Sequence, residues 1–465
     1  MYDLKIINGR TPDFTTAEFR EQDIAIQKGK IADLGKNLGE AEKIIDARGK
    51  IVSPGFVDIH MHEEFLREGS EKIHYDISKR MALMGVTTAL AGNCGNNRMD
   101  MSFFSQYITK YGAPVNYLSL IGHNYLREQV GIEDRYREAR EEEIDQMKKL
   151  LQKALDLGVV GISFGLEYSP GITLHEVEKL IEPFKNQDLL LAAHYRKDAK
   201  YALEAVEEMI EISRRSGLPM QISHISSCAA FGMMDEALEM IDKAQQEGLD
   251  ITVDTYPYNA FSTYLGSAVF DDGCFELWGK GPEIILLTEE PYRGEYCDME
   301  LFKKVRKEHP EMLVAAFAMD EEDIDLAVKV PGVMIASDGL LREGQGHPRA
   351  AGTFPRVLGK YVREKGTLTL IDALYKMTFL PAKRLGIHSQ KGLIKTGFDA
   401  DLVIFDPETI MDRATFEEPV LPPVGIDYVL INGETAVKGQ QLLRENLGTF
   451  LPKVKTYRIT KPTLR

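Results

Sequence analysis

Short apolar runs alternate with longer amphipathic runs through most of the chain. Nine runs have the length and composition of buried strands, namely FVDIHMH, VTTALAGN, VNYLSLIGH, VVGISFGLE, LLLAAHYR, MQISHIS, DITVDTYPY, LVAAFAM and VMIASDG. Most of them are separated by runs with helical spacing of the apolar positions, such as EEEIDQMKKLLQKALDLG and YALEAVEEMIEISRRSG. Short apolar strands that alternate with helices predict an α/β fold with a parallel sheet.

The number of strand candidates favours a (β/α)8 TIM barrel over an open doubly wound sheet. A barrel needs one strand fewer than the pattern offers. We assign the surplus strand to an insertion at about 259–330, where the pattern becomes irregular. The catalytic barrel is therefore expected to span residues 55–387.

The sequence pattern at both ends of the chain differs from that of the middle, with short β-like runs separated by turns. DLKIING, DIAIQKGKIADLG and EKIIDARGKIVSPG lie at the start, and ADLVIFDPETI and IDYVLINGETAVKG lie near the end. The two ends of a domain often lie close together. We therefore expect residues 1–54 and 388–465 to form one small β-sandwich domain, with the barrel inserted between them.

Composition and charge exclude some classes of protein. The 465 residues are 44% hydrophobic and 28% charged, which is ordinary for a globular protein, and the net charge of −16 argues against a nucleic-acid partner. No apolar run reaches the length of a membrane span, and MYDLKIINGR lacks a signal-peptide core. Four cysteines in a chain of this length do not suggest a disulfide scaffold. We expect a cytoplasmic protein with reduced thiols.

Residues of metal-ligand type recur at the ends of the predicted strands. Catalytic groups of a TIM barrel lie at the carboxyl ends of its strands. One histidine at such an end is more often a hydrogen-bonded core residue, but here the same residue types follow strand after strand. In chain order they are His60, His62, Cys94, His123, Glu167, His194, His224 and Asp338. This recurrence predicts a metal site.

The first strand carries the sharpest form of this signal. His60 and His62 are two residues apart, so in a strand they project to the same side. Histidine together with a thiolate suits zinc. A catalytic zinc needs a position open to water and a carboxylate that takes and returns protons. Asp338 is placed for that task, and the chemistry implied is metal-assisted hydrolysis.

Several motifs follow one another in an order that resembles a known family over almost the whole chain. IVSPGFVDIHMH contains the histidine pair, GNCG spans 92–95, and HPRAAGTFPRVLGKYVRE spans 347–364. The remaining motifs are GLEYSPG, HYR, ISH, DTYPY, ASDG, KMTFLPAKRLGI and KGLIKTGFDADLVIFDP. The set resembles the metal-dependent amidohydrolase superfamily, and within it the N-acyl-D-amino-acid deacylases, or D-aminoacylases. GNCG and HPRAAGTFPR are the motifs most specific to that branch.

The resemblance implies zinc-dependent hydrolysis of a linear amide, with deacylation of N-acyl-D-amino acids as the expected reaction. It implies that Cys94, His194 and His224 hold one tightly bound zinc, with His60 and His62 at a neighbouring, weaker site that Cys94 also reaches. Asp338 would be the general acid and base. Glu167 stands where many relatives carry a carboxylated lysine, so it would bridge two metals or lie outside them. The D preference comes from the resemblance alone.

Residues that would bind the substrate are harder to assign. An N-acyl amino acid carries a carboxylate near the reacting amide, and the planar fork of an arginine suits a carboxylate. The candidates are Arg196, Arg349, Tyr168, Tyr258 and His123. Deacylases of this kind are expected to carry a basic residue soon after the sixth-strand histidine, as in S-H-x-K, whereas this chain reads ISHISSCAAFG. The departure favours a neutral or hydrophobic amino acid, or a different amide.

Other functions remain open at this stage. A cyclic amidase or an isoaspartyl dipeptidase of the same superfamily would use the same metal chemistry, although GNCG argues against those relatives. A non-catalytic metal-binding barrel would lack a general base, and Asp338 is present. A cysteine hydrolase that uses Cys94 as its nucleophile would be inactivated by thiol alkylation, an effect that chelators would not reproduce. Barrels of this kind often form homo-oligomers, but the sequence shows no interface.

Overall fold

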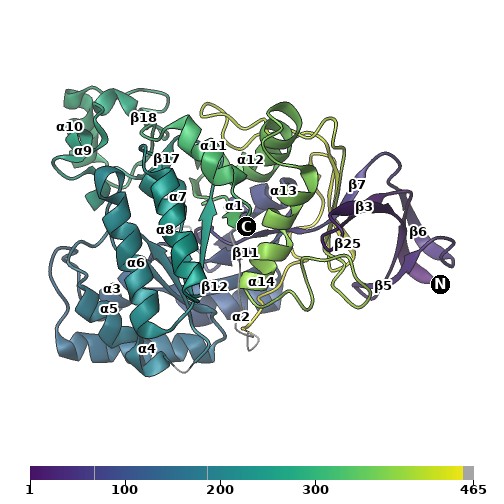
Figure 1. The fold of residues 1–465 in the computed structure, drawn as a ribbon, viewed down its shortest axis with the longest axis horizontal. Helices are drawn as coiled ribbons and strands as arrows, with labels where there is room; N and C mark the ends of the chain where they lie inside the picture. The colour runs from purple at the N-terminus through teal and green to yellow at the C-terminus, as the bar shows by residue number, and fades with distance from the viewer. Residues whose placement is uncertain (67–68, 186, 454–465) are drawn as a thin grey trace.

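A computed structural model describes residues 1–66, 69–185 and 187–453 (Figure 1). Its centre is a TIM barrel, as predicted. Eight parallel strands follow in the order β8 (Phe56–Asp58), β11 (Val86–Ala91), β12 (Asn116–Gly122), β13 (Gly161–Gly165), β14 (Leu190–His194), β15 (Met220–Ile222), β16 (Ile251–Thr255) and β20 (Val333–Ile335). Backbone contacts beyond the ends of β8 and β20 close the ring, because Asp338 N–H donates to His60 O at 2.8 Å and His62 N–H donates to Gly339 O at 3.1 Å.

Helices cover the outside of this ring. Those with the longest amphipathic runs are α4 (Glu141–Asp156), α6 (Ala202–Ser216) and α8 (Met234–Gln246). In α4 the apolar residues face the barrel at helical spacing, and three glutamates occupy the first turn, where the helix dipole favours negative charge. The other helices around the barrel are α1 (Ile77–Leu83), α2 (Met101–Tyr111), α3 (His123–Gln129), α5 (Leu174–Ile181), α7 (Ile225–Ala229), α11 (Glu321–Lys329), α12 (Arg349–Arg356), α13 (Leu370–Met377) and α14 (Phe379–Arg384).

Strands from both ends of the chain form two sheets beside the barrel, at the right of Figure 1. One sheet has the order β5 (Lys30–Gly35), β4 (Asp23–Gln27), β1 (Tyr2–Ile7), β6 (Ala41–Asp46). The other has the order β26 (Gln441–Leu442), β25 (Glu434–Lys438), β24 (Ile426–Ile431), β23 (Leu402–Phe405), β7 (Ile51–Pro54), β2 (Arg10–Asp13), β3 (Glu18–Glu21). Apolar side chains from both sheets form one core, so the sheets pack face to face.

One strand pairing in this second sheet joins the two ends of the sequence. Strand β7 lies antiparallel to β23, with Ile51 opposite Phe405 and Pro54 opposite Leu402. The domain limits at 54 and 388 stay a prediction, and residues 454–465 of the predicted domain lie outside the described residues.

The ninth strand candidate lies outside the barrel. It is β19 (Leu313–Ala316), which pairs antiparallel with β17 (Phe261–Tyr264) and with β18 (Ile285–Leu287). These strands, with α9 (Cys274–Trp278) and α10 (Met299–Glu308), lie between β16 and β20 in the chain and form the upper left of Figure 1. Trp278 packs edge-on against Phe261 at 5.5 Å between ring centroids, which ties α9 to this sheet.

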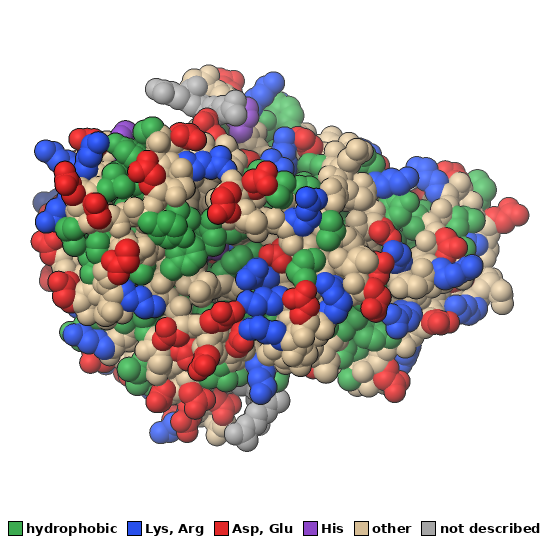
Figure 2. Space-filling model, turned by 90° about the horizontal axis from the view of Figure 1, so that it is seen from above, with side chains coloured by type: hydrophobic (Ala, Val, Ile, Leu, Met, Phe, Trp, Pro, Cys, Tyr) green, Lys and Arg blue, Asp and Glu red, His purple; other side chains and the backbone are tan. Residues whose placement is uncertain are grey.

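Two short hairpins follow the first and last barrel strands. They are β9 (Phe65–Leu66) with β10 (Ile73–His74), and β21 (Leu341–Arg342) with β22 (Gln345–Gly346). Acidic and basic side chains alternate over the face in Figure 2, without a broad patch of one sign. Within the described ranges, every helix is too short or too polar to cross a membrane.

Candidate metal centre and its pocket

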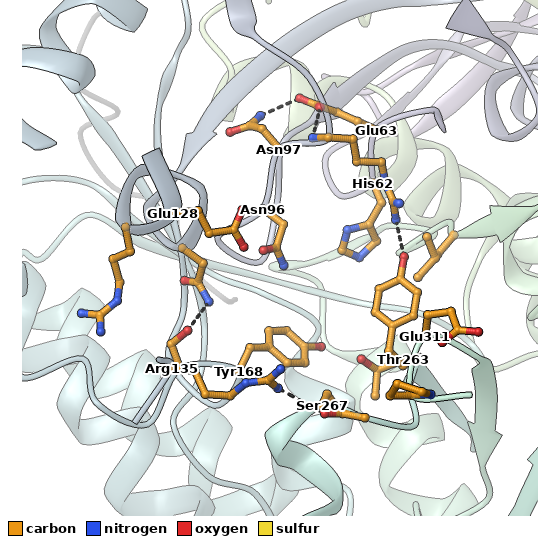
Figure 3. A pocket seen from close by; sticks show the side chains of 18 of the residues that line it. His62, Glu63, Asn96, Asn97, Glu128, Arg135, Tyr168, Thr263, Ser267 and Glu311 are labelled. Atoms are coloured by element: carbon orange, nitrogen blue, oxygen red, sulfur yellow. Dashed lines mark hydrogen bonds between the residues drawn. The ribbon is translucent and has the colours of Figure 1, made fainter. Parts of the chain in front are cut away.

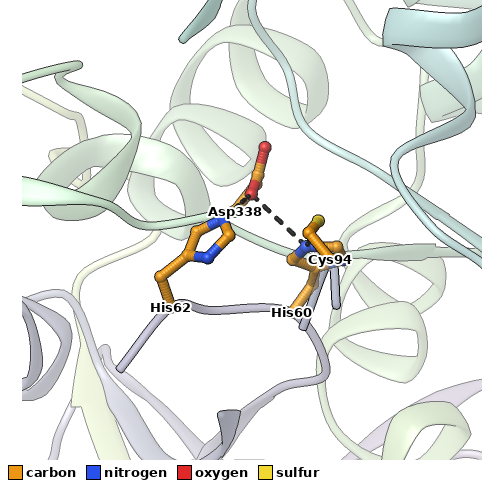
Figure 4. Close-up of side chains that lie close together, drawn as sticks. All are labelled: His60, His62, Cys94 and Asp338. Atoms are coloured by element: carbon orange, nitrogen blue, oxygen red, sulfur yellow. Dashed lines mark hydrogen bonds and ion pairs between the residues drawn. The ribbon is translucent and has the colours of Figure 1, made fainter. Parts of the chain in front are cut away.

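The two histidines of the first strand lie just beyond the end of β8. Asp58 is the last residue of that strand, and its carboxylate accepts from the backbone N–H of both His60 and Ser337, which fixes β8 against the chain leaving β20. His60 is buried and His62 is half-buried. His60 Nε2 lies 3.3 Å from Cys94 Sγ and 3.3 Å from Asp338 Oδ1, and His62 Nε2 lies 3.0 Å from the same oxygen (Figure 4).

Cys94 joins this group to a second one. Its sulfur lies 3.4 Å from His224 Nε2, and that nitrogen lies 3.1 Å from His194 Nδ1. Within the described residues, the groups with the density of ligand atoms that a metal ion needs are His60, His62, Cys94, Asp338 and Cys94, His194, His224. The structure therefore brings together six of the residues that the sequence singled out, with Cys94 common to both groups.

The backbone at three of these residues adopts a conformation that L-residues rarely take. The φ angles are +54° at Cys94, +32° at His224 and +50° at Asp338. Such angles cost about 1–3 kcal/mol each and persist where the surrounding structure holds them. Gly165 helps to hold Cys94, because a Cβ at that glycine would lie 2.3 Å from the Cys94 carbonyl oxygen.

The electrostatics of the centre favour a thiolate. Burial by itself would raise the pKa of Cys94, but the facing imidazoles of His60 and His224 hold it well below its ordinary value. Burial would lower the pKa of His60, and the nearby Cys94 and Asp338 raise it well above its ordinary value. The negative groups thus need positive charge beside them. A buried thiolate with imidazole nitrogens and a carboxylate is a donor set that fits a divalent metal such as zinc.

The histidine nitrogens that point away from the centre have partners of their own. His194 Nε2 lies 2.8 Å from Glu167 Oε2, and His224 Nδ1 lies 2.8 Å from Ser227 Oγ. A hydrogen donated outward in this way leaves the inward nitrogen free to bind a metal. Glu167 thus contacts the far side of a predicted ligand. Its own ligand role stays a prediction.

Asp254 is a residue whose place in the site the sequence did not reveal. It lies in β16, and its Oδ1 accepts from the backbone N–H of His224 at 2.8 Å and lies 3.6 Å from His60 Nδ1. One carboxylate therefore positions a histidine from each group. The sequence did contain a signal for this role, because an aspartate within a buried strand needs a hydrogen-bond or ion-pair partner.

Asp338 has a strong partner on the side away from the histidines. Arg349 Nη2 lies 2.8 Å from Asp338 Oδ2, and both residues are buried. Burial would raise the pKa of Asp338, but Arg349 and His60 hold it well below its ordinary value. Arg349 also stacks on the ring of Tyr256, at 4.7 Å. Its Nε and Nη1 have no hydrogen-bond partner among the described residues.

Three of the residues predicted to bind substrate have close contacts with other side chains of the protein. The Arg196 guanidinium donates hydrogen bonds to the Glu208 carboxylate at 2.8–3.1 Å and to the carbonyl of Ile172. His123 is buried 3.0 Å from Glu176. Tyr258 packs under the guanidinium of Arg356. Strand position alone could not reveal these partners, since each partner side chain lies on a helix whose packing the strand pattern does not give. A substrate role for Arg196, His123 and Tyr258 stays a prediction that these contacts do not favour.

A cavity of about 560 Å³ opens beside the centre (Figure 3). We call it the vestibule. Its wall includes His62, Asn96, Arg98, Tyr168, Thr263 and Tyr264. A smaller hollow of about 20 Å³ lies against Glu167, His194, His224 and Asp338, and Tyr168, Ser262 and Thr263 line both spaces. The vestibule is thus the approach to the metal centre, and Tyr168 lies at the junction.

Comparison with known proteins places the chain in a family. A model described as "Amidohydrolase family" matches residues 43–326 and 332–437. The chain belongs to this family. The amidohydrolase is 31% identical to a D-aminoacylase from Alcaligenes xylosoxydans xylosoxydans, over 97% of this chain and 98% of that protein. It is also 31% identical to an N-acyl-D-glutamate deacylase from the same organism, over 93% of each chain.

Solved structures agree with this placement. One, of a D-aminoacylase with a binuclear metal centre, superposes on the amidohydrolase with a TM-score of 0.87 at 30% identity, over 97% of this chain and 99% of the other. Another is an N-acyl-D-glutamate deacylase from Bordetella bronchiseptica, complexed with zinc and a phosphonate inhibitor, with a TM-score of 0.85 at 31% identity and the same coverage. A D-hydantoinase at 21% identity and a TM-score of 0.65 shares the fold.

Proposed function

We propose that this amidohydrolase is a zinc-dependent N-acyl-D-amino-acid deacylase, which hydrolyses a linear amide to a carboxylate and a free D-amino acid. The observation that carries the proposal is Cys94, buried between two groups of histidines with Asp338 3.3 Å from His60. Similarity to the D-aminoacylase and to the N-acyl-D-glutamate deacylase over almost the whole chain supports the type of substrate.

The residues divide between metal binding and proton transfer. Cys94, His194 and His224 would hold the tightly bound zinc, and His60 and His62 would hold a second, weaker one. Zinc bound here polarises the amide carbonyl and lowers the pKa of water. Among ligands of this kind, thiolate and imidazole are those that zinc prefers.

Asp338 moves the proton in this proposal. Its carboxylate stays ionised at neutral pH because Arg349 and His60 hold its pKa well below the ordinary range. It therefore accepts the proton of the attacking water and delivers it to the nitrogen of the leaving amine. Arg349 also fixes the direction of the carboxylate, since one of its nitrogens lies 2.8 Å from Asp338 Oδ2.

Arg349 also has the unused donors that a substrate carboxylate needs. Its Nε and Nη1 are buried without partners among the described residues, and so is the hydroxyl of Tyr256, on whose ring Arg349 stacks. Unpaired buried donors cost about 1–3 kcal/mol each, which an incoming carboxylate would recover. We assign the α-carboxylate of the substrate to this corner, with the Tyr168 hydroxyl at the junction to the vestibule.

We propose the cytoplasm as the compartment of the reaction and a small molecule as its substrate. All four cysteines are free, which is usual for proteins of a reducing compartment. Homo-oligomer formation stays a prediction, as does the absence of a nucleic-acid or membrane partner.

Metal analysis of the purified protein, together with a hydrolysis screen of N-acetyl-D- and N-acetyl-L-amino acids, tests the proposal. We expect at least one zinc per chain and release of D-amino acids only. Cys94→Ala should lose the tightly bound metal, whereas Cys274→Ala, which removes a buried cysteine of the insertion, should keep it. Zinc without D-amino-acid release would refute the substrate and direct attention to cyclic amides and dipeptides. Failure to bind zinc would refute the site.

A further inference from the structure

Arg98 is a cation at the inner wall of the vestibule to which the mechanism gives no role. It follows the GNCGNN segment between β11 and α2, is half-buried, and lines the same cavity as His62. Its backbone N–H donates to Glu63 Oε2 at 2.7 Å, so the loop that supplies Cys94 also fixes the start of this side chain.

Two contacts hold the side chain in one place. The guanidinium carbon lies 3.5 Å from the ring centroid of Phe65, and Nη2 donates to the hydroxyl of Tyr264 at 2.9 Å. Phe65 comes from the hairpin after the first barrel strand, and Tyr264 comes from β17 of the insertion. A guanidinium held by stacking loses less conformational entropy when it binds a ligand, which increases its affinity.

The guanidinium has no ion-pair partner in the parts of the chain that the structure describes. Two other arginines near the site already have ion-pair partners. Arg127 pairs with Glu176 at 2.6 Å, and Arg349 pairs with Asp338 at 2.8 Å. The buried carboxylate of Glu63 accepts from Asn97 Nδ2 and from the Arg98 backbone, so its oxygens already have donors.

Other acidic residues of the vestibule lie farther out. Glu128, Glu133 and Glu311 line the cavity, and all three are exposed. Water and salt screen exposed charges strongly, whereas a half-buried charge in a cavity is screened less. Arg98 is thus the half-buried cation of the wall, and the charge of the buried Glu63, which lines the same cavity, acts on it.

We propose that Arg98 binds a carboxylate of the substrate in the vestibule, in addition to the α-carboxylate at Arg349. The substrates preferred are then N-acyl amino acids with a further acidic group, either on the amino-acid side chain or on the acyl group. This rests on the proposed deacylase function and specifies its substrate class. It also revises the sequence-based expectation of a neutral side chain, because Arg98 supplies a cation that the ISHISS segment does not.

The vestibule has the size and shape for such a group. A volume of about 560 Å³ is within the usual range of small-molecule sites, and the wall combines apolar and aromatic side chains with amides and hydroxyls. Asn96, Ser262 and Thr263 offer further polar atoms around the place that a carboxylate would occupy.

Matched pairs of substrates test the proposal on the zinc-loaded protein. N-acetyl-D-glutamate is compared with N-acetyl-D-glutamine for an acid on the side chain, and N-succinyl-D-alanine with N-succinamoyl-D-alanine for an acid on the acyl group. In at least one pair, kcat/KM of the acid should exceed that of the amide by roughly 10- to 100-fold, the usual effect of a charge-assisted hydrogen bond. The pair that shows the preference identifies the source of the carboxylate.

Variants then connect the preference to this residue. Arg98→Gln should remove the preference for the acid and leave kcat/KM of the amide within about threefold, since only the charged contact is lost. Arg98→Lys should restore part of it. Arg135→Gln removes a cation from the exposed part of the same wall and should leave the preference unchanged. An equal loss on acid and amide in Arg98→Gln would mean a structural role and would overturn the proposal.

Binding measurements separate this proposal from the deacylase function. Calorimetry with D-glutamate and D-glutamine, and with succinate and succinamate, needs no turnover. If no N-acyl-D-amino acid is hydrolysed but an acid binds at least tenfold more tightly than its amide in an Arg98-dependent way, the anion site stands and the deacylase function fails. If neutral N-acetyl-D-amino acids are hydrolysed and neither pair shows an acid preference, the deacylase stands and the role of Arg98 is refuted.

Discussion

A cluster of buried polar residues at the metal centre contrasts with another where the small β domain meets the barrel. In the second, Lys391 Nζ lies 2.8 Å from Asp399 and 2.5 Å from Asp401. Asp401 also accepts from Asn116 Nδ2 of the barrel at 3.0 Å and from the backbone of Asn432 at 2.7 Å. Each charge in this ion network faces an opposite charge or a donor.

The metal centre also contains complementary pairs, such as Arg349 with Asp338, but it brings groups of the same kind against one another as well. His194 Nδ1 faces His224 Nε2 at 3.1 Å, and the Cys94 sulfur lies between two imidazole nitrogens. Buried polar groups without complementary partners are costly, so they are retained where a ligand completes them. A buried network in which every charged group has a partner therefore supports the fold, whereas a buried network that needs a further ligand is typical of a binding site.

The largest effect is expected at Asp338. Asp338→Asn keeps the shape but cannot accept the proton, so kcat should fall by about 10²–10⁴-fold while bound zinc is retained. Steady-state kinetics with metal analysis measure both quantities. Asp325→Asn, which alters an ion-paired carboxylate on a surface helix, should leave both unchanged. Loss of zinc from Asp338→Asn would show that Asp338 is mainly a ligand.

The ion network should respond through stability. Lys391→Met leaves two aspartates without their cation, and removal of one partner from a buried pair costs about 3–5 kcal/mol of unfolding free energy. Lys30→Met removes an exposed partner of the same Asp399 and should cost less than about 1 kcal/mol. Denaturant unfolding measures both. Equal losses would show that burial does not distinguish the two lysines.

Glu167 is expected to act on metal affinity. Glu167→Gln weakens the contact that orients His194, so zinc affinity should fall by about 10- to 100-fold with unchanged stoichiometry. Competition with a chelator measures the affinity. Glu208→Gln, which alters the acid paired with Arg196, serves as the control. Loss of one of two bound zinc ions would instead support Glu167 as a bridging ligand.

Lys376 should contribute a pH dependence that is independent of the metal. Burial lowers the pKa of Lys376 from 10.5 to about 7, and its Nζ donates to the carbonyls of Val328 and Val330. Between these two values the unfolded chain binds the proton and the folded protein does not. The unfolding free energy should therefore rise with pH in this range, by at most about 1.4 kcal/mol per pH unit from this residue.

Denaturant unfolding between pH 7.5 and 9.5 measures that slope. Lys376→Met should flatten it, whereas Lys365→Met, which removes an exposed lysine paired with Asp325, should keep it. A slope that survives in Lys376→Met would mean that other groups cause it.

The sequence predicted the barrel and the choice of its strands, because strand length, apolar character and alternation with helices are local properties. It also predicted the strand-end residues that meet at the centre, since parallel strands deliver their carboxyl ends to one face. The surplus strand was recognised by the irregular pattern around it, and β19 lies in that region.

Long-range contacts and backbone strain could not be predicted in this way. The pairing of Arg196 with Glu208 depends on how the helix after β14 packs. The positive φ angles at Cys94, His224 and Asp338 could not be predicted either, because the residue type at these positions does not determine the backbone angle. Arg98 has no strand position at all, so its stacking on Phe65 appears only when the first hairpin and the insertion meet across the vestibule.

The pairing of β7 with β23 has a consequence for how the protein is made. Ile51–Pro54 leaves the ribosome roughly 350 residues before Leu402–Phe405, an interval of about 20 to 70 s at ~5–20 residues per second. Throughout that time this edge of β7 lacks its neighbour, and an unpaired apolar edge invites pairing with other chains. A nascent chain that stalls within the barrel would therefore expose a strand edge that is prone to aggregation. Strand β23, which pairs with this edge, is translated only after the whole barrel.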